Sequence, residues 1–223
     1  MPEAGLPTDC AEAARIVSEA SAEIATKGLV SATSGNVSAR VGDEIVITPR
    51  RGRLDSIPPE NCRRVRIDDG QEFEPGGEWE PSSETPLHLA VYRASDAGVV
   101  IHTHSTYATA LSTIADELPA IHYLIAGFGG PVRVAPYATF GSEELAANVT
   151  AALQGRRGAL LANHGAVVHA DRMDRAVDLA FQLEWLSRIY LLAIGAGEPK
   201  LLDQAELDQV AERAVTLRYG IEG

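Results

Sequence analysis

The sequence predicts a single α/β domain built on a mixed, largely antiparallel sheet. First, segments with apolar residues every three or four positions, typical of helices, are interspersed with short β-branched runs, typical of strands. Second, the two kinds of segment alternate unevenly, which favours a mixed sheet over a strict parallel repeat. Third, 223 residues are an ordinary length for one α/β domain, so we expect residues 1–223 to form one.

The N-terminal part is predicted to contain one helix and at least two strands. Apolar residues recur at helical spacing over 9–27, and Gly28 is placed to end that helix. The β-branched run 44–48 and the alternating run 65–67 are predicted strands. The stretch 72–81 is rich in Gly, Pro and Glu, so we expect an exposed loop there.

Helices and strands then alternate to the C-terminus. Ser83 is a predicted cap for a helix over 84–95, and the buried strand 99–101 leads directly into a His-Thr-His motif. The remaining predicted elements are a helix from 105, an apolar segment 121–128, a strand 132–135, a helix 142–155, strands at 159–162 and 167–168, a helix from Asp171 to about 194 and a helix 204–218.

Composition excludes two classes of partner. The chain has 19 basic and 31 acidic residues, a formal net charge of −12, and so lacks the positive surplus that captures nucleic acid. No apolar run approaches the roughly 20 residues of a bilayer-spanning helix. The acidic N-terminus lacks the pattern of a secretory signal, so we expect a cytoplasmic protein without membrane contact.

Three histidines are placed to share a metal ion. His102 and His104 are two positions apart on a predicted strand, so their imidazoles point to the same face. His164 follows another apolar strand and precedes a glycine. Three imidazoles with an open fourth position are typical of catalytic zinc, although imidazole also suits other transition metals. The alternative is that the His-Thr-His motif arose by chance and only packs.

A carboxylate near these histidines is a candidate base. Glu84, which follows Pro-Ser-Ser, has this position, although it could instead be a first-turn charge that complements the helix dipole. The other histidines, His88, His122 and His169, have no ligand spacing. We expect them on a helix surface, in packing and in a loop, respectively.

Two features suit an anion. Gly35 and Asn36 lie in a turn where backbone N–H groups can form a nest, and Ser82 and Ser83 can add hydroxyls and helix N-terminal amides. The second feature is an arginine cluster within an acidic chain: Arg50, Arg51, Arg53, Arg63, Arg64 and Arg66. It could be a solvated edge, a site for an anionic substrate or an intersubunit ion-pair patch.

Taken together, these segments resemble the class II aldolase/adducin-head family. The resemblance covers nearly the whole chain, and the matching stretches stand in family order: 33–40 (TSGNVSAR), 47–49 (ITP), 81–84 (PSSE), 100–104 (VIHTH), 119–123 (PAIHY), 135–141 (APYATFG) and 163–165 (NHG). The resemblance implies a three-layer α/β/α fold and a cyclic homotetramer with active sites between subunits.

The resemblance also implies roles for single residues. His102, His104 and His164 would bind zinc, or another divalent ion such as Mn²⁺ or Co²⁺, and Glu84 would be both a ligand and the base. Tyr123 would be a proton donor lent by a neighbouring subunit. The other positions carried over are Gly35, Asn36, Ser82 and Ser83 at the phosphate, Phe140 at the interface and Tyr219 in a tail that closes over the substrate.

The implied function is that of a metal-dependent aldehyde-lyase. It would cleave a ketose 1-phosphate, such as L-fuculose 1-phosphate, into dihydroxyacetone phosphate and a short aldehyde such as lactaldehyde. One departure concerns Arg50 and Arg51, which stand where the family's aldolases have Thr-Gly or Ser-Gly. We expect Arg50 to bind the phosphate, because a guanidinium can hold it bidentately.

Other functions occur on the same fold. They are a pentulose-phosphate 4-epimerase, a methylthioribulose-phosphate dehydratase and a non-enzymatic adducin-like interaction module. The epimerases carry Asp where Glu84 stands, and an interaction module is expected to have lost the metal ligands, all of which are present here.

Overall fold

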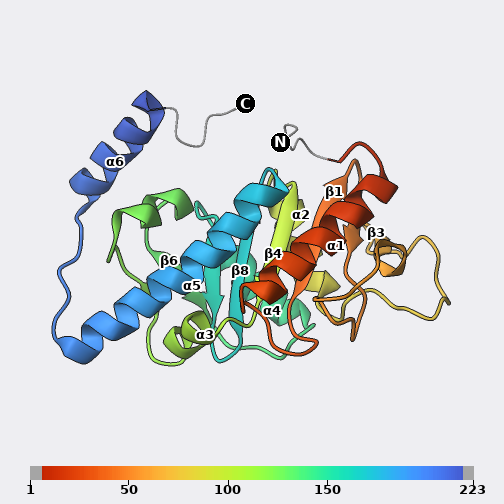
Figure 1. The fold of residues 1–223 in the computed structure, drawn as a ribbon, viewed down its shortest axis with the longest axis horizontal. Coiled ribbons are helices and arrows are strands. Elements are labelled where there is room, and N and C mark those ends of the chain that lie inside the picture. The colour runs from red at the N-terminus through yellow and green to blue at the C-terminus, as the bar shows by residue number, and fades with distance from the viewer. Residues whose placement is uncertain (1–6, 218–223) are drawn as a thin grey trace.

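The computed structural model describes residues 7–217, and an eight-stranded sheet forms its centre (Figure 1). The strand order is β3-β2-β1-β4-β8-β7-β6-β5, and neighbours are antiparallel except β6 and β7, which are parallel. The strands are β1 (Asn36–Val41), β2 (Glu44–Ile47), β3 (Arg63–Arg66), β4 (Val99–Thr103), β5 (Glu117–Leu118), β6 (Val132–Ala135), β7 (Gly158–Leu161) and β8 (Gly165–Ala170). The predicted mixed, largely antiparallel sheet is confirmed.

Helices cover both faces of this sheet, which gives the three layers that the family resemblance implied. On β4, Val99 and Ile101 belong to one apolar cluster and Val100 to the other, because successive strand residues point to opposite faces. The first cluster includes residues of α1, α3 and α5, and the second includes residues of α2 and α4. The helices are α1 (Cys10–Thr26), α2 (Thr85–Ala94), α3 (Thr106–Ser112), α4 (Glu143–Ala152), α5 (Met173–Ala196) and α6 (Gln204–Thr216), with short 3₁₀ helices η1 (Pro59–Asn61) and η2 (Tyr123–Phe128).

Several helix ends follow from local chemistry within the predicted ranges. Asp9 caps α1 by accepting a hydrogen bond from the backbone N–H of Glu12 at 2.9 Å. After that helix ends, Gly28 adopts a φ of 73°. Ser142 caps α4 by accepting from the backbone N–H of Leu145 at 3.1 Å.

Two predicted helix starts are wrong. Ser83 does not cap α2; the N-cap residue is Glu84, whose side chain makes no capping hydrogen bond because its carboxylate contacts histidines instead. Asp171 does not cap α5, whose N-cap position is held by Arg172. The strand predicted at 65–67 begins two residues earlier and ends one residue earlier, at Arg63–Arg66, where it pairs with β2.

The junction between β4 and β8 positions the site. Thr103 at the end of β4 pairs with Ala166, and a Cβ atom at Gly165 would overlap the carbonyl oxygen of Thr103. Only glycine fits this approach, which brings the turn before β8 next to the end of β4. Among residues 7–217, no helix combines the length and the apolar character needed to cross a membrane.

Replacing Gly165 by Ala should therefore force β8 away from β4. We expect Gly165→Ala to lower the free energy of unfolding by about 1–3 kcal/mol, the usual cost of overpacking. Gly195→Ala is the matched control, because it lies in α5 with open space around it, and alanine there should raise stability by up to about 1 kcal/mol. Urea unfolding measures both; equal stability of the two variants would contradict this packing argument.

Candidate metal centre

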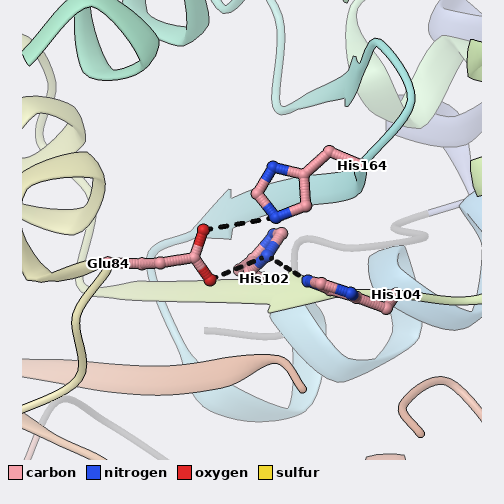
Figure 2. A group of neighbouring side chains, drawn as sticks. All are labelled: Glu84, His102, His104 and His164. Atoms are coloured by element: carbon pink, nitrogen blue, oxygen red, sulfur yellow. Dashed lines mark hydrogen bonds and ion pairs between the residues drawn. The ribbon is translucent and has the colours of Figure 1, made fainter. Parts of the chain in front are cut away.

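Four side chains from three parts of the fold meet at the end of β4. His102 lies on β4, His104 directly follows it, His164 lies in the turn before β8, and Glu84 lies at the start of α2. Figure 2 shows the four pointing toward one another, and their ligand atoms all lie within 4.8 Å of each other. The structure thus brings together the four residues that the sequence singled out as metal ligands.

The nitrogen and oxygen atoms at the centre are close. The Nε2 atoms of His102 and His104 are 2.9 Å apart. Glu84 reaches two imidazoles, with Oε2 3.1 Å from Nε2 of His102 and Oε1 3.3 Å from Nε2 of His164.

Hydrogen bonding around the cluster orients its histidines. Nδ1 of His102 lies 2.9 Å from the carbonyl oxygen of Ala166, which can only accept, so Nδ1 carries the proton. The Nε2 lone pair of a neutral His102 then faces the cluster. A ligating histidine in a metal site typically makes this kind of outer hydrogen bond.

Electrostatics keep two of the imidazoles neutral. Burial, with His102 nearby, lowers the pKa of His104 to about 3 and that of His164 to about 4. Burial acts against the charge on Glu84, but the facing histidines outweigh it and hold the pKa of its carboxyl below the usual range. At neutral pH the carboxylate is ionised and His104 and His164 are neutral, as a metal requires of its ligands. His102 differs: burial acts against its charge, but Glu84 raises its pKa overall, so metal binding would release a proton from this ring.

These residues fit a divalent cation. Oε1 of Glu84 is buried and makes no hydrogen bond within residues 7–217, although buried carboxylate oxygens normally do. Three imidazole nitrogens and one carboxylate oxygen are a donor set that suits zinc and related transition metals.

A buried chain of polar side chains lies behind Glu84. The Asn36 amide nitrogen donates to Oε2 of Glu84 at 3.0 Å, and its oxygen is hydrogen-bonded to Nε2 of His88. Nδ1 of His88 lies 2.7 Å from the Ser38 hydroxyl, which contacts Tyr92. This chain fixes the orientation of the carboxylate.

The sequence analysis misplaced two histidines outside the metal cluster. His88, expected on a helix surface, is fully buried, and burial lowers its pKa to about 3. Its position four residues after Glu84, on the same face of α2, was the available signal. His169 lies on β8 rather than in a loop, with Nε2 3.0 Å from the carbonyl oxygen of Arg156.

A cavity of about 280 Å³ opens beside Glu84, His104 and His164. Its wall includes Gly35, Asn36, Ser82, Ser83 and Phe140, all predicted site residues. Gly35 has a φ of 80°, and a Cβ there would lie 2.9 Å from the carbonyl oxygen of His102, so the nest turn packs closely on β4. The side-chain amide of Asn36, in contrast, is already occupied by Glu84 and His88.

The arginine cluster divides into paired and unpaired members. Five of its six arginines have a carboxylate within 4.0 Å: Arg50 with Glu80, Arg53 with Asp55, Arg63 with Glu72, Arg64 with Glu44 and Arg66 with Asp69. Arg51 has none within the described part of the chain. Arg50 and Arg51 both line the cavity, and Arg51 has a φ of 61°, which is unusual for a residue with a side chain.

The remaining predicted site residues lie farther out. Tyr123 is 52% exposed at the start of η2, where it stacks on His122 with ring centroids 4.5 Å apart, and it is not part of the cavity wall. Phe140 is on that wall and 63% exposed. Tyr219 lies outside the described residues.

Comparison with known proteins gives consistent matches. Residues 15–191 match the family described as Class II Aldolase and Adducin N-terminal domain. A 5-methylthioribulose-1-phosphate/5-deoxyribulose-1-phosphate aldolase of Rhodospirillum rubrum is 35% identical, over 91% of this chain and 90% of the relative. L-fuculose phosphate aldolase of Escherichia coli is 37% identical, over 94% and 97%. A solved L-fuculose 1-phosphate aldolase superposes with a TM-score of 0.86 at 36% identity, covering 91% of this chain and 95% of that one.

The four-residue cluster predicts stoichiometric metal binding. Purified protein should hold about one divalent ion per chain, because three imidazoles and a carboxylate complete a tetrahedral set. The His102→Ala/His104→Ala double variant should lose it, whereas His122→Ala, outside the cluster, should keep it. Elemental analysis by mass spectrometry measures both, and full occupancy in the double variant would show that the ion binds elsewhere.

Proposed function

Because the chain belongs to the class II aldolase and adducin N-terminal domain family, we propose that it cleaves a ketose 1-phosphate into dihydroxyacetone phosphate and a short aldehyde. The curated relatives are aldolases, which are carbon–carbon lyases, and class II aldolases depend on a metal ion. The observation that carries the proposal is the Glu84–His₃ cluster at the wall of a cavity with anion-binding features.

The metal ion is proposed to be Zn²⁺, with Mn²⁺ or Co²⁺ as alternatives, held by His102, His104, His164 and Glu84. A divalent ion there supplies Lewis acidity, which stabilises negative charge on substrate oxygens by several kcal/mol. The buried imidazoles and the polar chain behind Glu84 hold these groups in place before substrate arrives, so little reorganisation is needed.

Proton transfer is assigned to two residues of this chain. In the direction of condensation, Glu84 removes a proton from the carbon next to the ketone, and Tyr123 donates a proton to the aldehyde oxygen. In the direction of cleavage, Tyr123 takes the proton from the corresponding hydroxyl and Glu84 returns a proton to the carbon next to the ketone. Tyr123 is half-exposed and away from the cavity of its own subunit, which supports a role in the site of a neighbouring subunit of a homotetramer. Phe140 would line that shared site.

The phosphate end of the substrate is assigned to the part of the cavity wall that carries Gly35, Ser82 and Ser83. These residues offer backbone N–H groups and hydroxyls there. For the guanidinium contact, Arg51 replaces the predicted Arg50, because Arg50 donates to Glu80 at 3.0 Å and Arg51 is without an ion-pair partner among residues 7–217. Asn36 is proposed to orient the Glu84 carboxylate, to which its side-chain amide donates a hydrogen bond, and not to bind phosphate.

The aldehyde end decides which ketose is used. The names of the relatives offer two kinds of substrate: L-fuculose 1-phosphate, whose cleavage releases lactaldehyde, and 5-deoxyribulose or 5-methylthioribulose 1-phosphate, which release a shorter or sulfur-bearing aldehyde. We propose a substrate like L-fuculose 1-phosphate. No feature of the described cavity favours the epimerase, the dehydratase or the interaction module.

A panel of phosphorylated ketoses tests the proposal. The enzyme should release dihydroxyacetone phosphate from L-fuculose 1-phosphate, and Glu84→Gln should lower kcat by roughly 10²–10⁴-fold, the usual contribution of a general base. A coupled reductase assay for dihydroxyacetone phosphate measures the rate, with metal analysis of Glu84→Gln as a check on the site. Faster release from 5-deoxyribulose 1-phosphate would reassign the substrate, and normal turnover by Glu84→Gln would reassign the base.

The two adjacent arginines should differ in their effect on substrate binding. Arg51→Ala should raise KM for the phosphorylated ketose by about 10- to 150-fold, because a charged hydrogen bond contributes about 1.5–3 kcal/mol. Arg50→Ala, the matched control, should change KM little, since its guanidinium is held by Glu80 at the surface. With the unphosphorylated sugar as substrate, both variants should match the wild type; a larger effect of Arg50→Ala would restore the sequence-based assignment.

A further inference from the structure

A second, larger cavity lies away from the metal centre. Its volume is about 560 Å³, and it shares no lining residue with the cavity beside Glu84. It is bounded by the last turn of α2, by η2, by the end of α4 and by the first turn of α5. Strand β8 connects the two regions, because His164 precedes its first residue and His169 near its other end lines this cavity. Pockets of about 300–1,000 Å³ are typical of small-molecule sites.

One part of the wall is apolar. Val91 on α2, Phe128 in η2 and Leu153 after α4 line it, and all three are buried. Three small residues, 126, 127 and 129, leave the space in front of them open. This part suits a flat or compact apolar group.

The other part of the wall is basic. Arg156, Arg157 and Arg175 line it together with His169, although the chain as a whole has a net charge of −12. No carboxylate lies within 4.0 Å of these three guanidinium groups in the part of the chain that the structure describes. Positive charge is therefore concentrated in a concave place without an internal counter-ion.

An unpaired buried nitrogen and the pKa shifts of this wall both indicate excess positive charge in the cavity. Nε of Arg175 is buried and makes no hydrogen bond within residues 7–217. Burial, and then the charge of Arg157, lower the pKa of both Arg175 and His169. The charges of Asp171 and Asp174 act in the opposite direction on Arg175, and that of Asp96 does so on His169. Asp174, however, is paired with Arg172 at 2.9 Å. An anion placed here would relieve the repulsion between like charges.

The loops that form the cavity are held in place by the backbone. The N–H of Arg157 donates to the carbonyl of Phe128 at 3.0 Å, and Nε of Arg156 donates to the carbonyl of Pro131 at 2.8 Å. A Cβ at Gly129, where φ is 84°, would lie 2.7 Å from the carbonyl oxygen of Gly155. The close approach of these two loops means that the cavity exists before a ligand binds, which lowers the cost of binding.

We propose that this cavity is a second ligand site, for a small metabolite that carries a phosphate group on an apolar body. The phosphate lies against Arg157 and Arg175, and the apolar body lies against Val91, Phe128 and Leu153. A guanidinium matches the geometry of phosphate oxygens, and two of them balance a dianion. The site is independent of the aldolase reaction proposed for the metal centre, so either can fail without the other.

Phenyl phosphate is a suitable probe because it joins a phosphate to a flat apolar ring. Isothermal titration calorimetry of the metal-loaded enzyme should give a binding event beyond any at the aldolase cavity, and inorganic phosphate should bind there more weakly because it lacks the ring. Arg157→Ala should weaken that event by about tenfold or more, the loss expected for one charged hydrogen bond. Arg175→Ala should do the same.

The variants and controls keep the outcome decisive. The Arg157 side chain is exposed and makes no hydrogen bond within the described residues, so Arg157→Ala should fold even if Arg175→Ala does not. Arg15→Ala removes an exposed arginine paired with Glu19 and should bind phenyl phosphate like the wild type. Aldol cleavage without phenyl phosphate should be unchanged in Arg157→Ala. If the wild type shows no binding event, or if Arg157→Ala leaves every binding event of the wild type intact, the proposal is overturned.

Discussion

The burial of the Glu84 carboxylate among three imidazoles constrains much of this fold. An ionised carboxylate is costly to bury unless charges or hydrogen bonds compensate it. Here His102 and His164 compensate it from one side and the Asn36 amide from the other. Asn36 in turn ties β1 to His88 on α2, and Glu84 leaves its helix without a side-chain cap. The carboxylate therefore brings together β1, β4, the turn before β8 and the start of α2.

Sequence patterns predicted the parts of the site that depend on local geometry. The period of two along a strand placed His102 and His104 on one face, and the glycine after His164 indicated a close approach. Hydrogen-bond and ion-pair partners that are distant in sequence could not be predicted from local patterns. The burial of His88 depends on its hydrogen bonds to Asn36 and Ser38, about 50 positions earlier. The guanidinium of Arg50 is hydrogen-bonded to Glu80, 30 positions later.

Helix starts illustrate the same limit. The helices predicted over 9–27 and 142–155 begin where expected, and the side chains of Asp9 and Ser142 cap them by accepting hydrogen bonds from their own first turns. At α2, Ser83 and Glu84 are two successive candidates for the N-cap position, and Glu84 takes it. The carboxylate of Glu84 contacts the histidines and is therefore unavailable for capping. Local propensity is thus reliable where a side chain has only local partners, and it fails where the site recruits that side chain.

Arginine is used in two ways in this acidic chain, and conformation distinguishes them. Arg50, Arg53, Arg63, Arg64 and Arg66 neutralise nearby carboxylates on and beside the β2–β3 edge. Arg51 differs because it holds a left-handed conformation, with φ 61°, at a cost of about 1–2 kcal/mol that glycine would avoid. A turn that needed only its backbone shape would be more stable with glycine. The side chain of Arg51 lies on the wall of the metal-side cavity, and the phosphate contact proposed for it there would compensate for this strain.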